Sequence, residues 1–128
     1  MIKDFDTWNE LKQHIHTTGV NGFYREREIW WCALGINIGF EEDGKGPESE
    51  RPVLVIKGFS KQLCIVVPLS TSMKKSPYYV PVGLVDNKPA TAMISHIRSI
   101  DPKRFINRIS YLNQTYFDLT KQAIRDML

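Results

Sequence analysis

An arginine and two hydroxyl residues stand at the ends of two short apolar runs, where they could act together on a phosphate. Arg51 opens the run 51–56, and Ser70 and Thr71 close the run 63–69. Both runs are rich in β-branched residues and too short for buried helices, which predicts two paired strands. A cation at the mouth of one strand and a hydroxyl at the exit of its partner could then face one phosphate group. The alternative is a core hairpin whose end residues only occupy the surface.

Two helices are expected at the ends of the chain. Apolar residues recur at helical spacing over residues 4–17, Asp4 or Asp6 can cap this helix, and Trp8 is expected to pack it on the body. Asn113 can cap a closing helix that carries an apolar side.

Further strands are expected between these helices, over residues 23–34, 78–82, 90–100 and 106–112. Five or six short strands with a closing helix indicate a fold that is mainly β with α, a small and strongly bent SH3-like β-barrel or half-barrel. We therefore divide the chain into an N-terminal helical extension, residues 1–22, and a barrel domain, residues 23–128.

The composition is that of an ordinary globular protein with an uneven charge distribution. The net charge is +3, yet residues 41–50 hold five acids against one lysine, and residues 51–128 hold twelve basic residues against four acids. A basic body suits a polyanion ligand, although it also suits a solvated surface. No apolar run approaches the roughly 20 residues of a membrane span, and no signal peptide is visible. Cys32 and Cys64 fall in predicted strands, and we expect reduced, buried thiols in a cytoplasmic protein.

Several common kinds of site are missing from the sequence. The glycine-rich stretch 35–50 contains neither phosphate-binding glycine motif, and the three histidines are scattered, so we expect no nucleotide cradle, cofactor or metal. Trp30 and Trp31 should point to opposite faces of a strand. One should enter the core, and the other could cover the opposite face, meet a partner or stack on a base.

Five segments in this order resemble the MazF/PemK family of toxin endoribonucleases. They are Glu28-Ile29-Trp30, Gly39-Phe40-Glu41, Arg51-Pro52-Val53-Leu54-Val55-Ile56, Val67-Pro68-Leu69-Ser70 and Ile97-Arg98-Ser99-Ile100-Asp101. The resemblance spans about residues 24–127. It implies a homodimer that cleaves single-stranded RNA without a metal, a small cognate antitoxin protein, and operator DNA binding only as the toxin–antitoxin complex.

The family's functional residues match this chain unevenly. Arg51 matches the family arginine, Glu41 matches its loop glutamate, and Ser70 occupies the position of its threonine, with Thr71 adjacent. Some members carry an Arg and an Asp where this chain has Met93 and Ser95, so that catalytic pair is absent.

The chemistry of RNA cleavage suggests roles for the remaining candidates. RNA supplies its own nucleophile, the 2′-OH, and the protein must supply an acid, a base and charge stabilisation. Glu41 and His96 are the candidates for proton transfer, beside the phosphate-binding candidates Arg51, Ser70 and Thr71. We expect four residues to contact RNA: Lys74, Lys75, Arg98 and Trp31. A non-catalytic module that binds nucleic acid or protein on the same barrel is the alternative.

Overall fold

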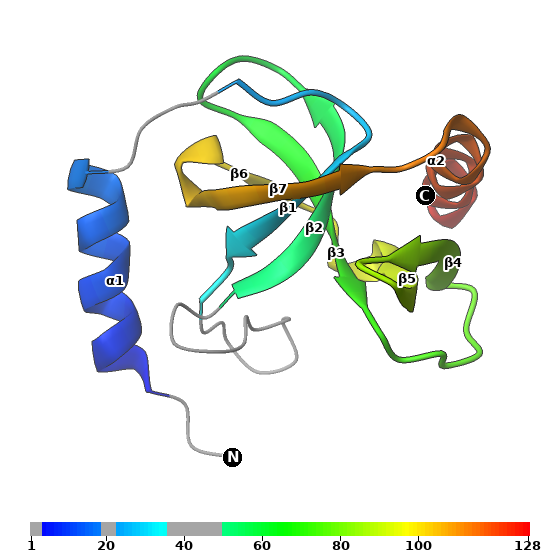
Figure 1. Cartoon of the computed structure of the whole chain (residues 1–128), viewed down its shortest axis with the longest axis horizontal. Coiled ribbons are helices and arrows are strands. Elements are labelled where there is room, and N and C mark those ends of the chain that lie inside the picture. The colour runs from blue at the N-terminus through cyan, green and yellow to red at the C-terminus, as the bar shows by residue number, and fades with distance from the viewer. Residues whose placement is uncertain (1–3, 19–22, 36–49) are drawn as a thin grey trace.

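The computed structural model describes residues 4–18, 23–35 and 50–128. Two helices flank seven strands (Figure 1). In chain order the elements are α1 (Phe5–Thr18), β1 (Glu28–Ala33), β2 (Glu50–Gly58), β3 (Cys64–Ser70), β4 (Tyr79–Val85), β5 (Lys88–Met93), β6 (Arg98–Ile100), β7 (Phe105–Tyr111) and α2 (Gln114–Met127). Single turns of 3-10 helix, Ile94–His96 and Pro102–Arg104, precede β6 and β7. Neither α1 nor α2 has the length and apolar character that crossing a membrane requires.

The strands form one curled antiparallel sheet, which confirms the predicted half-barrel. The strand order is β4-β5-β3-β2-β1-β7, and β6 pairs with the first half of β3. In Figure 1 the sheet wraps between the two helices, with α1 on one side and α2 on the other. The two paired runs predicted from the sequence are β2 and β3, at the centre of this order.

Apolar residues on both faces of β2 are buried, which explains why its sequence is a continuous apolar run. Leu54 and Ile56 belong to the core cluster that α2 covers through Phe117 and Ile124. The alternate residues Val53 and Val55 belong to a second cluster on the opposite face. Successive residues of a strand point to opposite faces, so each face of β2 contributes to a different core.

The C-terminal helix begins as the sequence predicts. The Asn113 side chain accepts a hydrogen bond from the Tyr116 backbone N–H at 2.9 Å, which satisfies one donor of the first turn. Phe117, Thr120 and Ile124 form the buried side of α2. This packing anchors the β4–β5 hairpin, because β4 lies against α2.

The N-terminal helix packs on the body through Trp8, as expected. The Trp8 side chain is only 4% exposed and lies against Gly35, immediately after β1. The Arg104 guanidinium lies over the Trp8 ring, 5.6 Å from its centroid. Trp8 therefore connects α1 to the end of β1 and to the 3-10 turn at Pro102–Arg104.

Three strand predictions are wrong in their extent. The strand expected over 78–82 continues to Val85. The strand expected over 23–34 begins only at Glu28, because Arg27 has a φ of 77° in a turn. The strand expected over 90–100 is interrupted at Ile94–His96, so His96 lies on a 3-10 turn. The chain must turn there because β5 pairs with the end of β3, at Leu69, whereas β6 pairs with its beginning.

Candidate active site

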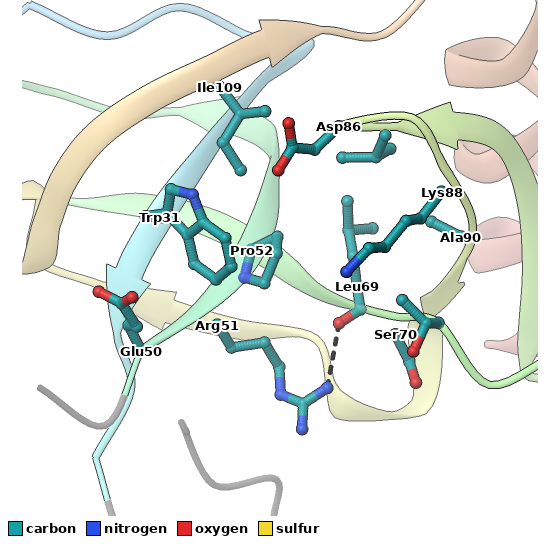
Figure 2. Close-up of a pocket in the computed structure, with 12 residues that line it drawn as sticks. Trp31, Glu50, Arg51, Pro52, Leu69, Ser70, Asp86, Lys88, Ala90 and Ile109 are labelled. Carbon is teal, nitrogen blue, oxygen red and sulfur yellow. Dashed lines mark hydrogen bonds between the residues drawn. The ribbon is translucent and has the colours of Figure 1, made fainter. Parts of the chain in front are cut away.

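Arg51 lies at the start of β2, beside the end of β3. Val53 pairs with Pro68, and continuing this antiparallel register places Arg51 opposite Ser70. The Arg51 Nη1 donates a hydrogen bond to the Leu69 carbonyl oxygen at 3.1 Å (Figure 2). The arginine is 7% exposed, so its guanidinium is packed against the protein rather than free in solvent. The predicted proximity of the arginine and the hydroxyl residues is therefore present in the fold.

Ser70 and Thr71 lie where β3 ends, and a buried threonine fixes the chain there. The Ser70 Oγ accepts a hydrogen bond from the Ser72 N–H at 3.0 Å. Thr91 on β5 is 1% exposed, and its hydroxyl donates to the Ser72 carbonyl at 2.9 Å. The Thr91 hydroxyl therefore joins β5 to the chain just after the exit of β3.

Arg51, Ser70 and Thr71 line one pocket of about 360 Å³. Figure 2 shows how side chains from separate strands converge on it. Its apolar lining consists of Trp31, Pro52, Leu69, Val85, Ala90 and Ile109, and its other polar lining residues are Glu50, Asp86 and Lys88. A pocket with a cation, hydroxyls and an indole can take an anionic group together with a flat ring.

The two adjacent tryptophans separate as the strand pattern predicts. Trp31 pairs with Pro52 on β2, and both line the Arg51 pocket. Trp30 packs on the other core cluster, where its ring stacks on Phe105 with centroids 5.1 Å apart. Trp31 is therefore the tryptophan available to a ligand of this pocket.

The other predicted site residues lie elsewhere or outside the described ranges. Glu41 falls outside the residues that the structure describes. His96 is half-buried on its 3-10 turn and does not line the Arg51 pocket. Lys74 and Lys75 are exposed after β3, and the Lys74 ammonium lies 5.6 Å from the Tyr79 ring centroid. Their roles stay predictions.

Arg98 belongs to a separate group of charges. It lies on β6, and its positive charge acts on Arg104 and on Cys32. Burial, with the nearby Arg98 charge, lowers the pKa of Arg104. Arg98 is not among the residues that line the Arg51 pocket.

Two polar residues of the pocket, Asp86 and Lys88, were missed from the sequence. Glu50 directly precedes Arg51, while Asp86 and Lys88 come from the β4–β5 turn. The chain turns at Asp86 and Asn87, between the end of β4 at Val85 and the start of β5 at Lys88, and the sequence did not show that these charges line the same pocket as Arg51. The signal was the Asp86-Asn87 pair, whose residue types tolerate the left-handed backbone that such a hairpin turn requires.

Among the residues that the structure describes, we find neither a reactive thiol nor a set of metal ligands. Burial raises the pKa of Cys32 and of Cys64 to about 12, so both stay protonated thiols at neutral pH. Residues 4–18, 23–35 and 50–128 contain no group of three metal-binding side chains placed to hold an ion.

The structure is similar to solved structures that are described as toxins or endoribonucleases. The chain is similar to the Mycobacterium tuberculosis toxin MazF-mt6, with 20% identity, a TM-score of 0.61 and coverage of 78% of this chain and 94% of that one. MazF from Deinococcus radiodurans matches with 16% identity and a TM-score of 0.67, over 83% and 96% of the two chains. A mycobacterial endoribonuclease solved with its cognate antitoxin matches with 12% identity and a TM-score of 0.61, over 81% and 93%. At these identities the likeness establishes the fold.

A match to a protein-family model shows which family the chain belongs to. No curated protein matches it. The family described as "PemK-like, MazF-like toxin of type II toxin-antitoxin system" matches residues 25–128, which include both sides of the Arg51 pocket. The chain therefore belongs to the PemK-like, MazF-like family of type II toxin–antitoxin toxins.

Proposed function

We propose that this toxin is an endoribonuclease that cleaves single-stranded RNA at specific sequences without a metal ion. The observation that carries the proposal is the hydrogen bond from Arg51 to the Leu69 carbonyl, which holds the guanidinium at the pocket that Ser70 also lines. Two phosphate-binding groups on rigid strands thus share one pocket with an indole. This combination suits a nucleotide better than a small inorganic anion.

The nucleophile in this proposal is the RNA 2′-OH, which attacks the adjacent phosphorus and expels the 5′-oxygen of the next nucleotide. Arg51 donates to the non-bridging oxygens, where negative charge develops. The hydroxyl of Ser70 or Thr71 donates to one of the same oxygens. Glu41 or His96 transfers the protons, directly or through water. Glu50 joins them as a carboxylate that lines the described pocket.

RNA binding in this proposal extends beyond the cleaved bond. Trp31 offers an indole face to a base inside the pocket. Lys74 and Lys75 lie in the segment after β3 and can contact the backbone of the same strand of RNA. Arg98 lies farther away, on β6, and would contact a more distant phosphate.

Family membership supports a proposal for the cellular setting. One structural relative is described as an endoribonuclease in complex with its cognate antitoxin. We therefore propose that this chain acts in the cytoplasm as a homodimer, and that a cognate antitoxin protein neutralises it. Operator DNA would bind only to the toxin–antitoxin complex.

Incubation of the purified chain with mixed-sequence single-stranded RNA in EDTA tests the activity. We expect discrete cleavage products that are absent when Arg51→Ala replaces the wild type. The chain has Ser70 at the family's threonine position and lacks the Arg/Asp pair of some members, which favours a binding module as the second candidate. RNA that is retained but never cut would support that candidate.

A further inference from the structure

The β4–β5 turn places an unassigned carboxylate at the Arg51 pocket. Asp86 and Asn87 have φ values of 52° and 63°, the two left-handed residues of a tight hairpin turn. β4 is held from behind by α2, where the Tyr116 ring lies against Gly83. The position of Asp86 is therefore set by the hairpin and by its support on α2.

The surroundings of Asp86 differ from those of Arg51. Figure 2 shows the Asp86 carboxylate beside Ile109, on the side of the pocket that Trp31 and Pro52 also line. Within the part of the chain that the structure describes, this carboxylate accepts no hydrogen bond and forms no ion pair. Asp86 is exposed, so water hydrates its two carboxylate oxygens, and both remain available to a ligand at this apolar, partly aromatic wall.

The opposite side of the same pocket carries the cations. Arg51 lies beside Leu69 and Ser70, and the Lys88 side chain extends toward Leu69 (Figure 2). The pocket therefore has a cationic side and an apolar side with a hydrogen-bond acceptor. A volume of about 360 Å³ gives room for a nucleotide base together with part of its phosphate.

We propose that Trp31 and Asp86 form a subsite for a guanine base of the RNA, an inference that rests on the proposed function. The two oxygens of a carboxylate match the adjacent N1–H and N2–H donors of guanine. Adenine instead presents the N1 lone pair at that edge, which a carboxylate repels. Trp31 stacks on either purine with similar strength. The carboxylate of Asp86 therefore selects guanine over adenine.

Turn chemistry alone could also explain an aspartate at this position, since Asp and Asn both tolerate left-handed backbone. Asp86→Asn separates the two explanations. The substitution keeps a residue suited to the turn but gives one acceptor and one donor group, a pattern that fits the adenine edge. The guanine preference should disappear while the hairpin stays folded.

The test is an NMR titration of the full ¹⁵N-labelled chain with GMP and with AMP. The Trp31 indole N–H signal, assigned with Trp31→Phe, reports on binding. We expect GMP to bind about tenfold more tightly than AMP, within the range for a two-bond base contact. Asp86→Asn should remove or reverse this preference, and Asp118→Asn on α2 should leave it unchanged. Equal binding of GMP and AMP, no Trp31 shift, or an unchanged preference in Asp86→Asn would overturn the inference.

Binding of GMP and AMP is measured without catalysis. The guanine subsite and the proposed nuclease activity can therefore be contradicted independently of each other. A chain that prefers GMP but cuts no RNA would contradict the nuclease and keep the subsite. A chain that cuts RNA but ignores the GMP/AMP difference would contradict the subsite and keep the nuclease. For an active chain, sequencing of cleavage sites should show a guanine preference at one fixed position that Asp86→Asn alone relaxes.

Discussion

The Arg51 guanidinium is tethered to the Leu69 carbonyl oxygen at 3.1 Å, one residue before Ser70. The tether spans β2 and β3, the two strands at the centre of the sheet order. A long side chain loses rotamer freedom when it binds, and this hydrogen bond removes part of that freedom in advance. The arginine is thus pre-organised for an anion in the pocket.

Arg51→Ala should abolish RNA cleavage and leave the fold intact. Loss of one donor to the developing charge typically lowers the rate by about a hundredfold or more. The measurement is initial cleavage rate, with circular dichroism to check the fold. Arg125→Ala, an exposed arginine on α2, is the matched control and should cleave as the wild type does. Near-normal activity of Arg51→Ala would remove the arginine from the mechanism.

Ser70→Ala should reduce cleavage much more than Thr71→Val. Ser70 lies opposite Arg51 by register and is half-buried, whereas Thr71 is exposed. Both line the pocket, so rates measured under identical conditions decide between them. The Ser70 hydroxyl also accepts the Ser72 N–H, so Ser70→Thr, which keeps a hydroxyl, should retain activity. A larger loss in Thr71→Val would assign the active hydroxyl to Thr71.

The strand pair and the helix caps were predictable because local patterns determine them. Two apolar β-branched runs separated by a turn specify β2 and β3, and Asn113 specifies where α2 begins. The break at Ile94–His96 was missed because non-local pairing to two parts of β3 causes it. Asp86 was missed for the same reason, since its place at the pocket that Arg51 lines depends on how the whole sheet curls. Sequence patterns along one segment carry no information about that curl.

Gly35→Ala should loosen α1 from the barrel. Gly35 has a φ of 76°, and a Cβ there would lie 1.8 Å from Cε2 of Trp8, so the indole must move. Overpacking of this kind typically costs about 1–3 kcal/mol of unfolding free energy. Thermal unfolding should show the loss, and tryptophan fluorescence should shift to longer wavelength as Trp8 meets water.

A double-mutant cycle with Trp8→Ala checks this interpretation. Once the indole is absent, the added methyl has nothing to displace except through backbone strain. The destabilisation by Gly35→Ala should therefore be clearly smaller in the Trp8→Ala background. Strict additivity would show that the clash with Trp8 is not the cause.

The chain should form a symmetric dimer in solution. β4 and α2 pack on each other and still leave Leu84 69% exposed and Leu119 55% exposed. Trp31 adds a partly exposed aromatic surface at the pocket, and we expect RNA to lie across or near the interface. Light scattering at micromolar concentration should give twice the mass of one chain. A monomer over the whole accessible concentration range would contradict the expectation.

A single 2′-deoxy substitution at the cleaved nucleotide should block cutting and leave binding nearly unchanged. The proposed nucleophile is that hydroxyl, while binding depends mostly on phosphates and stacked bases. EDTA should not inhibit cleavage of the all-ribose substrate, and the first product should carry a cyclic phosphate and a free 5′-hydroxyl. The control is a 2′-deoxy substitution two nucleotides away, which should be cut at the normal rate. Efficient cleavage of the substituted nucleotide would mean that water or a protein group attacks the phosphorus, and Arg51 and Ser70 would then need different roles.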